Sequence, residues 1–354
     1  MNILDERFAE FKKLPTEERV KCFEKNGRLF DMILSQQLNR EIIDNIYDIT
    51  NHLRHISESK AGSLFMQNIL CHKRAMLYFT QPSSRTFLSF ESACHMLGMK
   101  TSEIRDISVS SEVKGESYDD SLRTFSSYTD LIIIRHKGQD TAERAAWLLN
   151  THTNRPVPVI NGGSGSDQHP TQAVLDVYTL QRSFANQGGL DGKTILMCGD
   201  LKRGRTVRSL SYLMKNFEEI EIIFAAPKAF QMKEDVWSFL EGHKIPYHVE
   251  TEALENVLSK ADAIYMTRIQ DEHDTISGDS NRVDTSRFKL RPSDMSKVRS
   301  TAVIMHPFPR RDEIDVAIDF DPRAIYWRQE RNGMWTRAAL IAYIFDVHEE
   351  ILKH

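Results

Sequence analysis

Four short segments of the chain carry residue types that could bind an anion or polarise a carbonyl group. The first, Gln81 to Phe87 (QPSSRTF), lies between a predicted strand and a predicted helix. Hydroxyl groups, an arginine and the free N–H groups of a helix start are common ligands of a phosphate group. The segment lacks the glycine pattern of nucleotide-binding loops. A plain serine helix cap is the alternative interpretation.

The second segment, His169 to Gln172 (HPTQ), follows a glycine-rich loop and opens a predicted helix. A histidine there can polarise a carbonyl group, and Gln172 lies at the same end of the helix. A capping or buried structural histidine is the alternative. Another segment, His306 to Pro309 (HPFP), contains two prolines, which leave carbonyl oxygens able to accept hydrogen bonds from a ligand amine. Its alternative is a rigid turn, with or without a cis peptide bond.

The remaining segment has two parts, Gly199 to Thr206 (GDLKRGRT) and Thr267 to Gln270 (TRIQ). Both follow predicted strands, and the carboxyl edge of a parallel sheet is where α/β folds bind ligands. Arg205 and Arg268 could each bind a carboxylate through the planar guanidinium group. Structural ion pairs with nearby acids are the alternative.

These segments need rigid elements to position them, and short apolar runs alternate with helical patterns along the chain. Such runs are typical of strands buried on both faces of a parallel sheet. The alternation predicts an α/β fold. The predicted strands are residues 74–80, 131–136, 157–161, 194–198, 219–226, 263–267 and 302–305. A polar segment, residues 270–285, is either a lid or binding loop or a surface excursion.

Composition narrows the class of protein. The chain has 354 residues, more than the roughly 250–300 that one core supports, so two domains are expected. The balance of 46 basic and 50 acidic residues disfavours nucleic acid as the main partner. No apolar run reaches the roughly 18 residues of a membrane helix, and the N-terminus is too charged for a signal peptide. Four scattered cysteines indicate reduced thiols in the cytoplasm.

In their order along the chain, the four segments resemble the aspartate/ornithine carbamoyltransferase family, and its aspartate branch most closely. The resemblance rests on residues 77–99, 114–116, 134–136, 161–176, 198–210, 265–270, 306–314 and 332–333. The ornithine branch is unlike this chain, because it has a cysteine at the position of Phe308 and an S-M-G loop at Arg268 to Gln270. The match covers about residues 38–354. Residues 1–37 look like a helical extension, either a partner-binding helix or an intramolecular cover.

The resemblance implies two doubly wound parallel-sheet domains with the active site in the interdomain cleft. Residues 1–170 with 331–354 would bind carbamoyl phosphate, and residues 171–330 would bind aspartate. The implied reaction transfers the carbamoyl group to the amino group of L-aspartate, for pyrimidine synthesis. The family also implies a cytoplasmic homotrimer with active sites shared between subunits and with no metal or organic cofactor.

Site residues follow from the resemblance position by position. The phosphate would be bound by Ser83, Ser84, Arg85, Thr86 and Arg135. The carbonyl oxygen would be bound by Thr86, Arg135 and His169, and the carbamoyl amine by Gln172 and the carbonyls of Phe308 and Pro309. Aspartate would be positioned by Arg205, Thr206, Arg268 and Gln270, and a neighbouring subunit would lend Ser110 and Lys114.

Four positions depart from the aspartate branch. Gln81 replaces a glutamate, Phe87 and His273 replace arginines, and Phe308 replaces a leucine. Because Gln81 and His273 stand where the family has an acid–arginine contact, we expect a neutral or pH-sensitive contact in its place; drift is the alternative. Two other functions stay open at this point. One is transfer to a different amino acid, and the other is a weakly catalytic binding or regulatory homologue.

Overall fold

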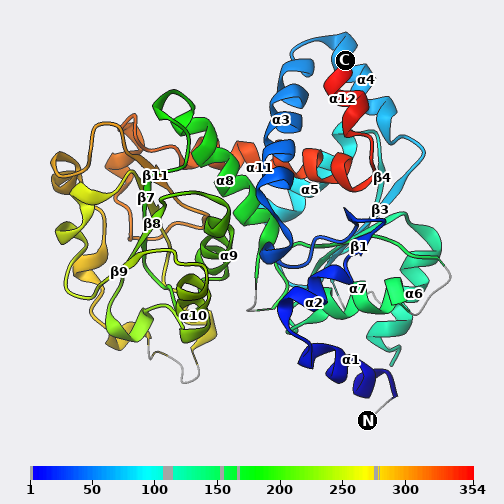
Figure 1. The fold of residues 1–354 in the computed structure, drawn as a ribbon, viewed down its shortest axis with the longest axis horizontal. Helices are drawn as coiled ribbons and strands as arrows, with labels where there is room; N and C mark the ends of the chain where they lie inside the picture. The colour runs from blue at the N-terminus through cyan, green and yellow to red at the C-terminus, as the bar shows by residue number, and fades with distance from the viewer. Residues whose placement is uncertain (1–2, 107–114, 152–154, 166–167, 275–277, 279) are drawn as a thin grey trace. The chain divides into compact units, whose positions relative to one another are not determined.

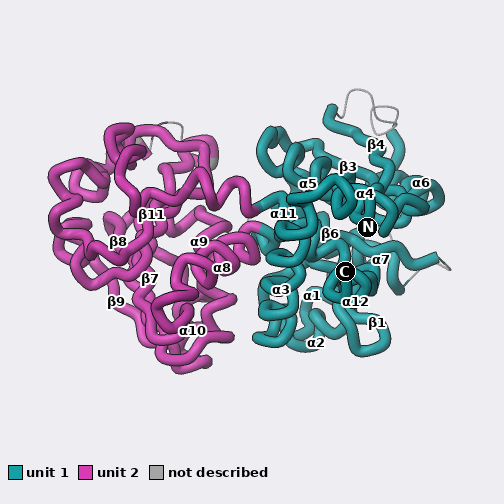
Figure 2. Tube along the Cα trace, turned by 90° about the horizontal axis from the view of Figure 1, so that it is seen from above, with its two compact units in different colours: residues 1–171, 333–354 teal, residues 172–332 magenta. Residues whose placement is uncertain are grey.

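The protein folds as two compact units (Figure 1). The structure, a computed structural model, describes residues 3–106, 115–151, 155–165, 168–274, 278 and 280–354. One unit comprises residues 1–171 with 333–354, and the other comprises residues 172–332 (Figure 2). The predicted α/β class is confirmed, because each unit holds a parallel sheet whose strands are joined through helices. No helix among the described residues is long and apolar enough to cross a membrane.

The sheet of the first unit has the strand order β4-β3-β5-β6, and all its pairs are parallel. Its strands are β4 (Lys100–Ile104), β3 (Arg74–Phe79), β5 (Leu131–Arg135) and β6 (Val159–Asn161). β3, β5 and β6 are the buried apolar runs that the sequence predicts. The edge strand β4 was not predicted, because its side chains are polar and mostly exposed.

The sheet of the second unit has the order β11-β10-β7-β8-β9 and is also parallel throughout. Its strands are β7 (Thr194–Cys198), β8 (Glu221–Ala225), β9 (Tyr247–Glu250), β10 (Ala263–Met266) and β11 (Val303–Met305). Again the buried strands were predicted and the polar edge strand, β9, was not.

Helices accompany both sheets. The first unit holds α1 (Ile3–Lys13), α2 (Thr16–Lys21), α3 (Arg40–Ile56), α4 (Lys60–Ile69), α5 (Ser84–Met96), α6 (Tyr118–Tyr128), α7 (Thr141–Thr151) and α12 (His348–Lys353). The second unit holds α9 (Arg205–Leu213) and α10 (Glu234–Gly242). The unit boundaries fall within α8 (Pro170–Phe184) and α11 (Tyr326–Ile344).

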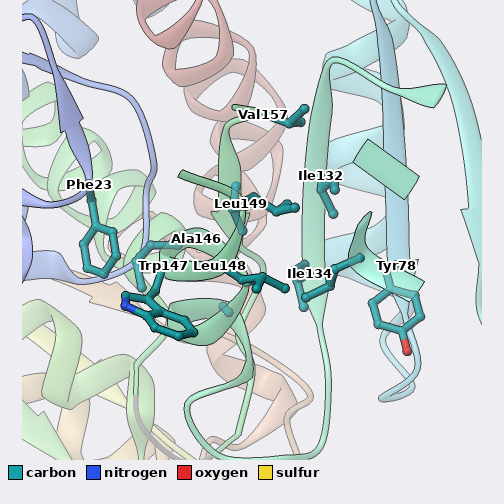
Figure 3. Close-up of a cluster of buried hydrophobic side chains, with 14 of the residues drawn as sticks. Phe23, Tyr78, Ile132, Ile134, Ala146, Trp147, Leu148, Leu149 and Val157 are labelled. Carbon is teal, nitrogen blue, oxygen red and sulfur yellow. The ribbon is translucent and has the colours of Figure 1, made fainter. Parts of the chain in front are cut away.

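The N-terminal segment packs on the first unit. Phe8 and Phe11 of α1 lie 5.3 and 6.3 Å, ring centre to ring centre, from Trp147 of α7. Phe23, which precedes the small hairpin of β1 (Glu24–Lys25) and β2 (Arg28–Leu29), joins the same buried cluster (Figure 3). Aromatic side chains buried in this way contribute strongly to stability. Of the two interpretations of residues 1–37, the contacts support the intramolecular cover.

Ion pairs add to this aromatic contact. Glu143 of α7 is buried and pairs with both Lys12 and Arg19. On the same helix, Arg144 donates to Asp119 at 2.8 and 2.6 Å and to Asp5 at 2.8 Å. The extension is therefore held to α7 by both apolar packing and charge.

Candidate functional site

The first group of predicted residues lies at the carboxyl edge of the first sheet. Phe79, the last residue of β3, pairs in register with Arg135, the last residue of β5. Beyond the strands, the backbone N–H of Gln81 donates to the Arg135 carbonyl at 3.1 Å. Parallel strands end at one edge, so the loop after β3 and the Arg135 side chain start from neighbouring points.

The loop after β3 leads directly into α5. Ser83 has extended backbone angles (φ −164°, ψ 111°) and is the N-cap residue, and Ser84 begins the helix. Arg85 is exposed and Thr86 is buried in the first turn. The sequence thus places two hydroxyls, a guanidinium and the positive end of a 13-residue helix together, which is an arrangement suited to an anion.

Arg135 and His169 meet at Gly163. A Cβ atom built on Gly163 would lie 2.8 Å from Arg135 Nη1 and 2.9 Å from His169 Cδ2, both too short for real contacts. The Gly163 φ angle is +100°, in the region that favours glycine. Arg135 Nη1 also donates to the Gly162 carbonyl at 3.2 Å. The loop after β6 therefore brings a guanidinium and an imidazole to one point, and sequence reasoning did not single out Gly163.

This loop is anchored by the segment that precedes α3. Asn161 Oδ1 accepts from the N–H groups of Gly163 and Ser164 at 2.9 and 2.8 Å, and its Nδ2 donates to the Ile33 carbonyl at 3.1 Å. Gln168, next to His169, accepts from the Ser35 N–H at 2.7 Å. Residues 33–35 thus hold the loop that carries His169, a role that no local sequence pattern predicts.

The second group lies at the carboxyl edge of the second sheet. Arg205 and Thr206 form the first turn of α9, after β7. Arg268 follows β10, the strand that pairs with β7. Between these loops the backbone is close: a Cβ on Gly199 would lie 1.9 Å from the Thr267 carbonyl oxygen, and its φ is +119°. Only glycine fits there, so Gly199 lets the two arginine-bearing loops adjoin.

Arg268 and the segment after it are held by ion pairs. Arg268 Nη1 donates to Glu272 Oε2 at 2.8 Å. Arg311 pairs with Asp271 at 2.9 Å, and this contact lowers the Asp271 pKa to about 2. These contacts anchor the segment and disfavour an unanchored surface excursion, and a lid or binding loop stays a prediction.

Further along this segment, Arg203 donates to Asp274 at 2.6 Å and to Ser280 at 2.8 Å. Hydrogen bonds from Ser280, and then from Arg203, lower the pKa of Asp274 to about 2. The Gln270 N–H donates to the buried Asp200 at 3.0 Å. The side chain of His273 lies outside the described part of the chain, so its contact with Gln81 stays a prediction.

The HPFP segment forms a fixed turn after β11. The Phe308–Pro309 peptide bond is cis, as one of the two sequence interpretations allowed. His306 is buried, and its Nδ1 accepts from the Phe308 N–H at 2.8 Å while its Nε2 lies 2.7 Å from Glu313 Oε1. The Phe308 ring stacks on Trp327 at 4.7 Å.

Gln172 belongs to a buried network in the second unit. Its Nε2 donates to Asp176 Oδ1 at 3.0 Å, one turn further along α8. Gln329 Nε2 donates to the same oxygen at 2.7 Å, and Tyr265 Oη donates to Oδ2 at 2.7 Å. Burial raises the pKa of Asp176 to about 7, although these donors favour the charged form. Sequence reasoning gave Asp176 no role, although this residue ends the family-like stretch of residues 161–176.

The structure therefore places the predicted residues in two groups. The first unit holds Ser83, Ser84, Arg85, Thr86, Arg135 and His169, and the second holds Gln172, Arg205, Thr206, Arg268, Gln270, Phe308 and Pro309. Ser110 and Lys114 lie outside the described residues. Phe87, which replaces a family arginine, is buried edge-on against Phe79 at 5.4 Å, and the Arg105 guanidinium lies 4.3 Å above its ring. An apolar residue therefore fits this position.

Comparison with known proteins places the chain in a family. Residues 31–182 match the carbamoyl-phosphate-binding domain of aspartate/ornithine carbamoyltransferases, and residues 191–344 match the aspartate/ornithine-binding domain. The chloroplastic aspartate carbamoyltransferase of Arabidopsis thaliana is 38% identical over 320 residues, covering 90% of this chain and 78% of that protein. The catalytic subunit of Thermoplasma volcanium aspartate carbamoyltransferase is 38% identical over 296 residues, covering 84% and 92%.

A solved structure agrees with these matches. Trypanosoma cruzi aspartate transcarbamoylase in complex with N-(phosphonacetyl)-L-aspartic acid superposes with a TM-score of 0.79 at 32% identity, covering 89% of this chain and 95% of that one. Sequence, domain content and fold all point the same way. The chain belongs to the aspartate/ornithine carbamoyltransferase family.

Proposed function

We propose that this protein is an enzyme that transfers the carbamoyl group of carbamoyl phosphate to the amino group of L-aspartate. The products are N-carbamoyl-L-aspartate, a precursor for pyrimidine synthesis, and phosphate. The observation that carries the proposal is the convergence of Arg135 and His169 on Gly163, beside the Ser83 to Thr86 loop. The family's curated relatives named above carry this activity in their names.

The phosphate of carbamoyl phosphate would bind at the start of α5. Ser83, Ser84 and Thr86 supply hydroxyl and backbone N–H donors, and Arg85 supplies a two-pronged guanidinium. Arg135 lies at the end of the strand beside this loop and adds a second positive charge. This set of donors and positive charges would stabilise an anion with two negative charges.

The carbonyl oxygen of the carbamoyl group would face Thr86, Arg135 and His169. When the aspartate nitrogen attacks, this oxygen gains negative charge in the tetrahedral intermediate, and fixed donors lower the barrier. Gly163 has no side chain, so the imidazole and the guanidinium can both approach its backbone, and Arg135 is fixed by its bond to the Gly162 carbonyl. Gln172 and the carbonyl oxygens of Phe308 and Pro309 would accept hydrogen bonds from the carbamoyl NH₂ group.

L-Aspartate would bind through its carboxylates to the arginines of the second unit. Arg205 and Arg268 follow neighbouring strands, and Thr206 and Gln270 supply further polar contacts. The amine attacks the carbonyl carbon, a C–N bond forms, and the C–O bond to phosphate then breaks. The departing phosphate takes the proton from the former amine. Catalysis would rest on positioning and fixed positive charge.

The assembly is a separate part of the proposal. We infer a homotrimer in which Ser110 and Lys114 enter the site of the neighbouring subunit, as the family resemblance implies. Sedimentation of the purified protein tests the trimer, and mixing inactive Lys114→Ala and Arg85→Ala chains tests the sharing of sites. Recovered activity in the mixture supports shared sites, and its absence contradicts them.

We also propose that the protein is cytoplasmic. The four scattered cysteines favour a reducing compartment such as the cytoplasm, whereas the Arabidopsis relative is chloroplastic by name. Microscopy of the protein tagged at its C-terminus would distinguish a cytoplasmic from an organellar protein.

The activity is tested with purified protein, carbamoyl phosphate and a panel of acceptors. Aspartate should be carbamoylated, and ornithine and N-acetylornithine should not. Arg85→Ala should reduce kcat/KM at least a hundredfold, because a charge-assisted phosphate contact is lost. Arg105→Ala, in a nearby exposed arginine that lies over the Phe87 ring, is the matched control and should retain most of the activity. Turnover of another acceptor, or none at all, contradicts the proposal.

A further inference from the structure

Asp176 is a fully buried acid to which the proposed reaction assigns no role. Its two oxygens receive hydrogen bonds from different elements. Oδ1 accepts from Gln172 Nε2 at 3.0 Å and from Gln329 Nε2 at 2.7 Å, and Oδ2 accepts from Tyr265 Oη at 2.7 Å. A carboxylate so enclosed must do more than fill space, because burying an acid is costly.

The contact with Gln172 decides which way its amide points. A side-chain amide has one end that donates and one that accepts, and a carboxylate oxygen only accepts. Nε2 of Gln172 must therefore face Asp176, and Oε1 is the end that can accept an N–H from a ligand. A carbamoyl NH₂ group has two N–H donors to offer.

We propose that Asp176 is a positioning residue that fixes the Gln172 amide with Oε1 toward the carbamoyl amine, so that the enzyme prefers NH₂ over a methyl group of similar size. The inference rests on the proposed function. It goes beyond that function by naming the group that selects the carbamoyl substituent.

A second arm of the network supports this assignment. The Gln329 amide that donates to Asp176 Oδ1 also accepts, through Oε1, from the backbone N–H of His306 at 2.9 Å. His306 opens the turn that presents the Phe308 and Pro309 carbonyls. One carboxylate oxygen therefore orients both sets of acceptors proposed for the carbamoyl amine.

The arrangement tolerates a proton on Asp176. In the protonated acid, Oδ2 can carry the proton and donate it to Tyr265 Oη, whose hydroxyl also contacts Thr206. Oδ1 then remains an acceptor for both amides. The orientation of Gln172 is thus independent of the charge on Asp176, and asparagine, with its oxygen on the amide side, should reproduce it.

Acetyl phosphate carries a methyl group in place of the NH₂ group of carbamoyl phosphate. It therefore distinguishes a lost orientation of the Gln172 amide from a general weakening of the binding site. For each variant, the KM for carbamoyl phosphate is compared with the inhibition constant of acetyl phosphate. In Asp176→Ala, we expect the KM to rise at least tenfold and the inhibition constant to change less than threefold. In Asp176→Asn, the ratio of the two should stay within threefold of wild type.

The matched control is Thr179→Val. Asn332 Nδ2 donates to Thr179 Oγ1 at 2.9 Å, a buried bond between the same two helices, α8 and α11, one turn beyond Asp176 and Gln329. Its loss should lower the melting temperature without changing the carbamoyl-to-acetyl ratio. If Asp176→Ala does not fold, Gln329→Leu tests the second arm, and we expect the ratio to change at least threefold.

Equal weakening of carbamoyl phosphate and acetyl phosphate in the folded variants would overturn the inference, as would no change in either. These outcomes differ from failure of the proposed function. In that case the wild-type protein would form no N-carbamoyl-L-aspartate, whatever residue stands at 176.

Discussion

Two buried carboxylates, one in each unit, are stabilised in opposite ways. Glu143 of α7 pairs with two cations, Lys12 and Arg19, that come from the N-terminal extension. Asp176 of α8 receives its hydrogen bonds from two amides and a phenol, all uncharged. Opposite charges favour the ionised form of an acid, whereas neutral donors offset burial only in part. The pKa of Asp176 accordingly rises to about 7.

The difference indicates what each acid does. A carboxylate shared by two cations links distant parts of the chain. Its removal should therefore lower the free energy of unfolding. A carboxylate shared by amides sets which end of each amide faces outward. Its removal should therefore change the preference for carbamoyl phosphate over acetyl phosphate. Variants that exchange or remove these partners should separate the two roles.

The largest effect is expected from Glu143→Ala. It leaves Lys12 and Arg19 without their shared acid in a partly buried place, which typically costs about 3–5 kcal/mol. Lys12 keeps Asp140 at 2.9 Å, so we expect a loss of about 3 kcal/mol in the free energy of unfolding. Urea unfolding measures it. Glu10→Ala, which breaks an exposed pair with Lys13 on α1, should cost less than about 1 kcal/mol.

The KM for carbamoyl phosphate distinguishes the role of Glu143 from that of Asp176. At a temperature where Glu143→Ala is fully folded, its KM for carbamoyl phosphate should remain within threefold of wild type. A tenfold rise would show that the ion pairs of Glu143 with Lys12 and Arg19 also orient the site, and the contrast with Asp176 would fail.

The second prediction concerns pH. Below about pH 4, Asp176 is protonated in both the folded and the unfolded chain. Between pH 4 and 7 the unfolded chain releases this proton while the folded chain keeps it, so folding stability falls as pH rises. The slope is about 1.4 kcal/mol per pH unit. Because asparagine does not titrate, the stability of wild type relative to Asp176→Asn should fall by about 2–3 kcal/mol from pH 5 to 7.

Chemical unfolding of both proteins across this range measures the difference. Thr179→Val provides the reference, since its stability relative to wild type should not depend on pH. A flat difference for Asp176→Asn would mean that the buried acid ionises near its ordinary pKa, with its donors stabilising the charged form fully.

The contrast also shows which features the sequence could predict. The buried strand Thr194–Cys198 was predicted with the bounds that the structure has, because an apolar run between polar segments is a local signal. The edge strand Tyr247–Glu250 was missed, since its side chains are polar and partly exposed. Edge strands gain their structure from pairing, here with β8, and not from their own pattern.

The site also contains residues that the sequence predicts and residues that only the fold reveals. The residues named from the family motifs follow strand ends, where a sequence pattern marks them. Asp176 lies in a family-like stretch but was given no role, because its partners Tyr265 and Gln329 are 89 and 153 residues away. Glu143 was likewise not named, because its partner Lys12 lies 131 residues earlier in the chain. Long-range contacts of this kind depend on topology and leave no local signal.

A smaller loss should follow from Lys12→Met. Arg19 continues to pair with Glu143, so the buried acid keeps one cation, and the methionine stem preserves most of the apolar packing. We expect a loss of about 1–2 kcal/mol, less than for Glu143→Ala. Measuring both variants by urea unfolding tests whether the two cations share the acid. A loss as large as that of Glu143→Ala would instead show that Lys12 alone provides the stabilisation by the Glu143 ion pairs.

The smallest effect is expected from Tyr265→Phe, which removes the hydroxyl group that donates to Asp176 Oδ2 and also contacts Thr206. Both amides still bind Oδ1, so the carbamoyl-to-acetyl ratio should remain within twofold of wild type. One buried acceptor loses its donor, and stability should fall by about 1–2 kcal/mol, as thermal unfolding would measure. A tenfold change in the ratio would show that Tyr265, and not the pair of amides, sets the orientation of the carboxylate. Asp176 would then act through Oδ2, and the neutral donors of the two oxygens would have different roles.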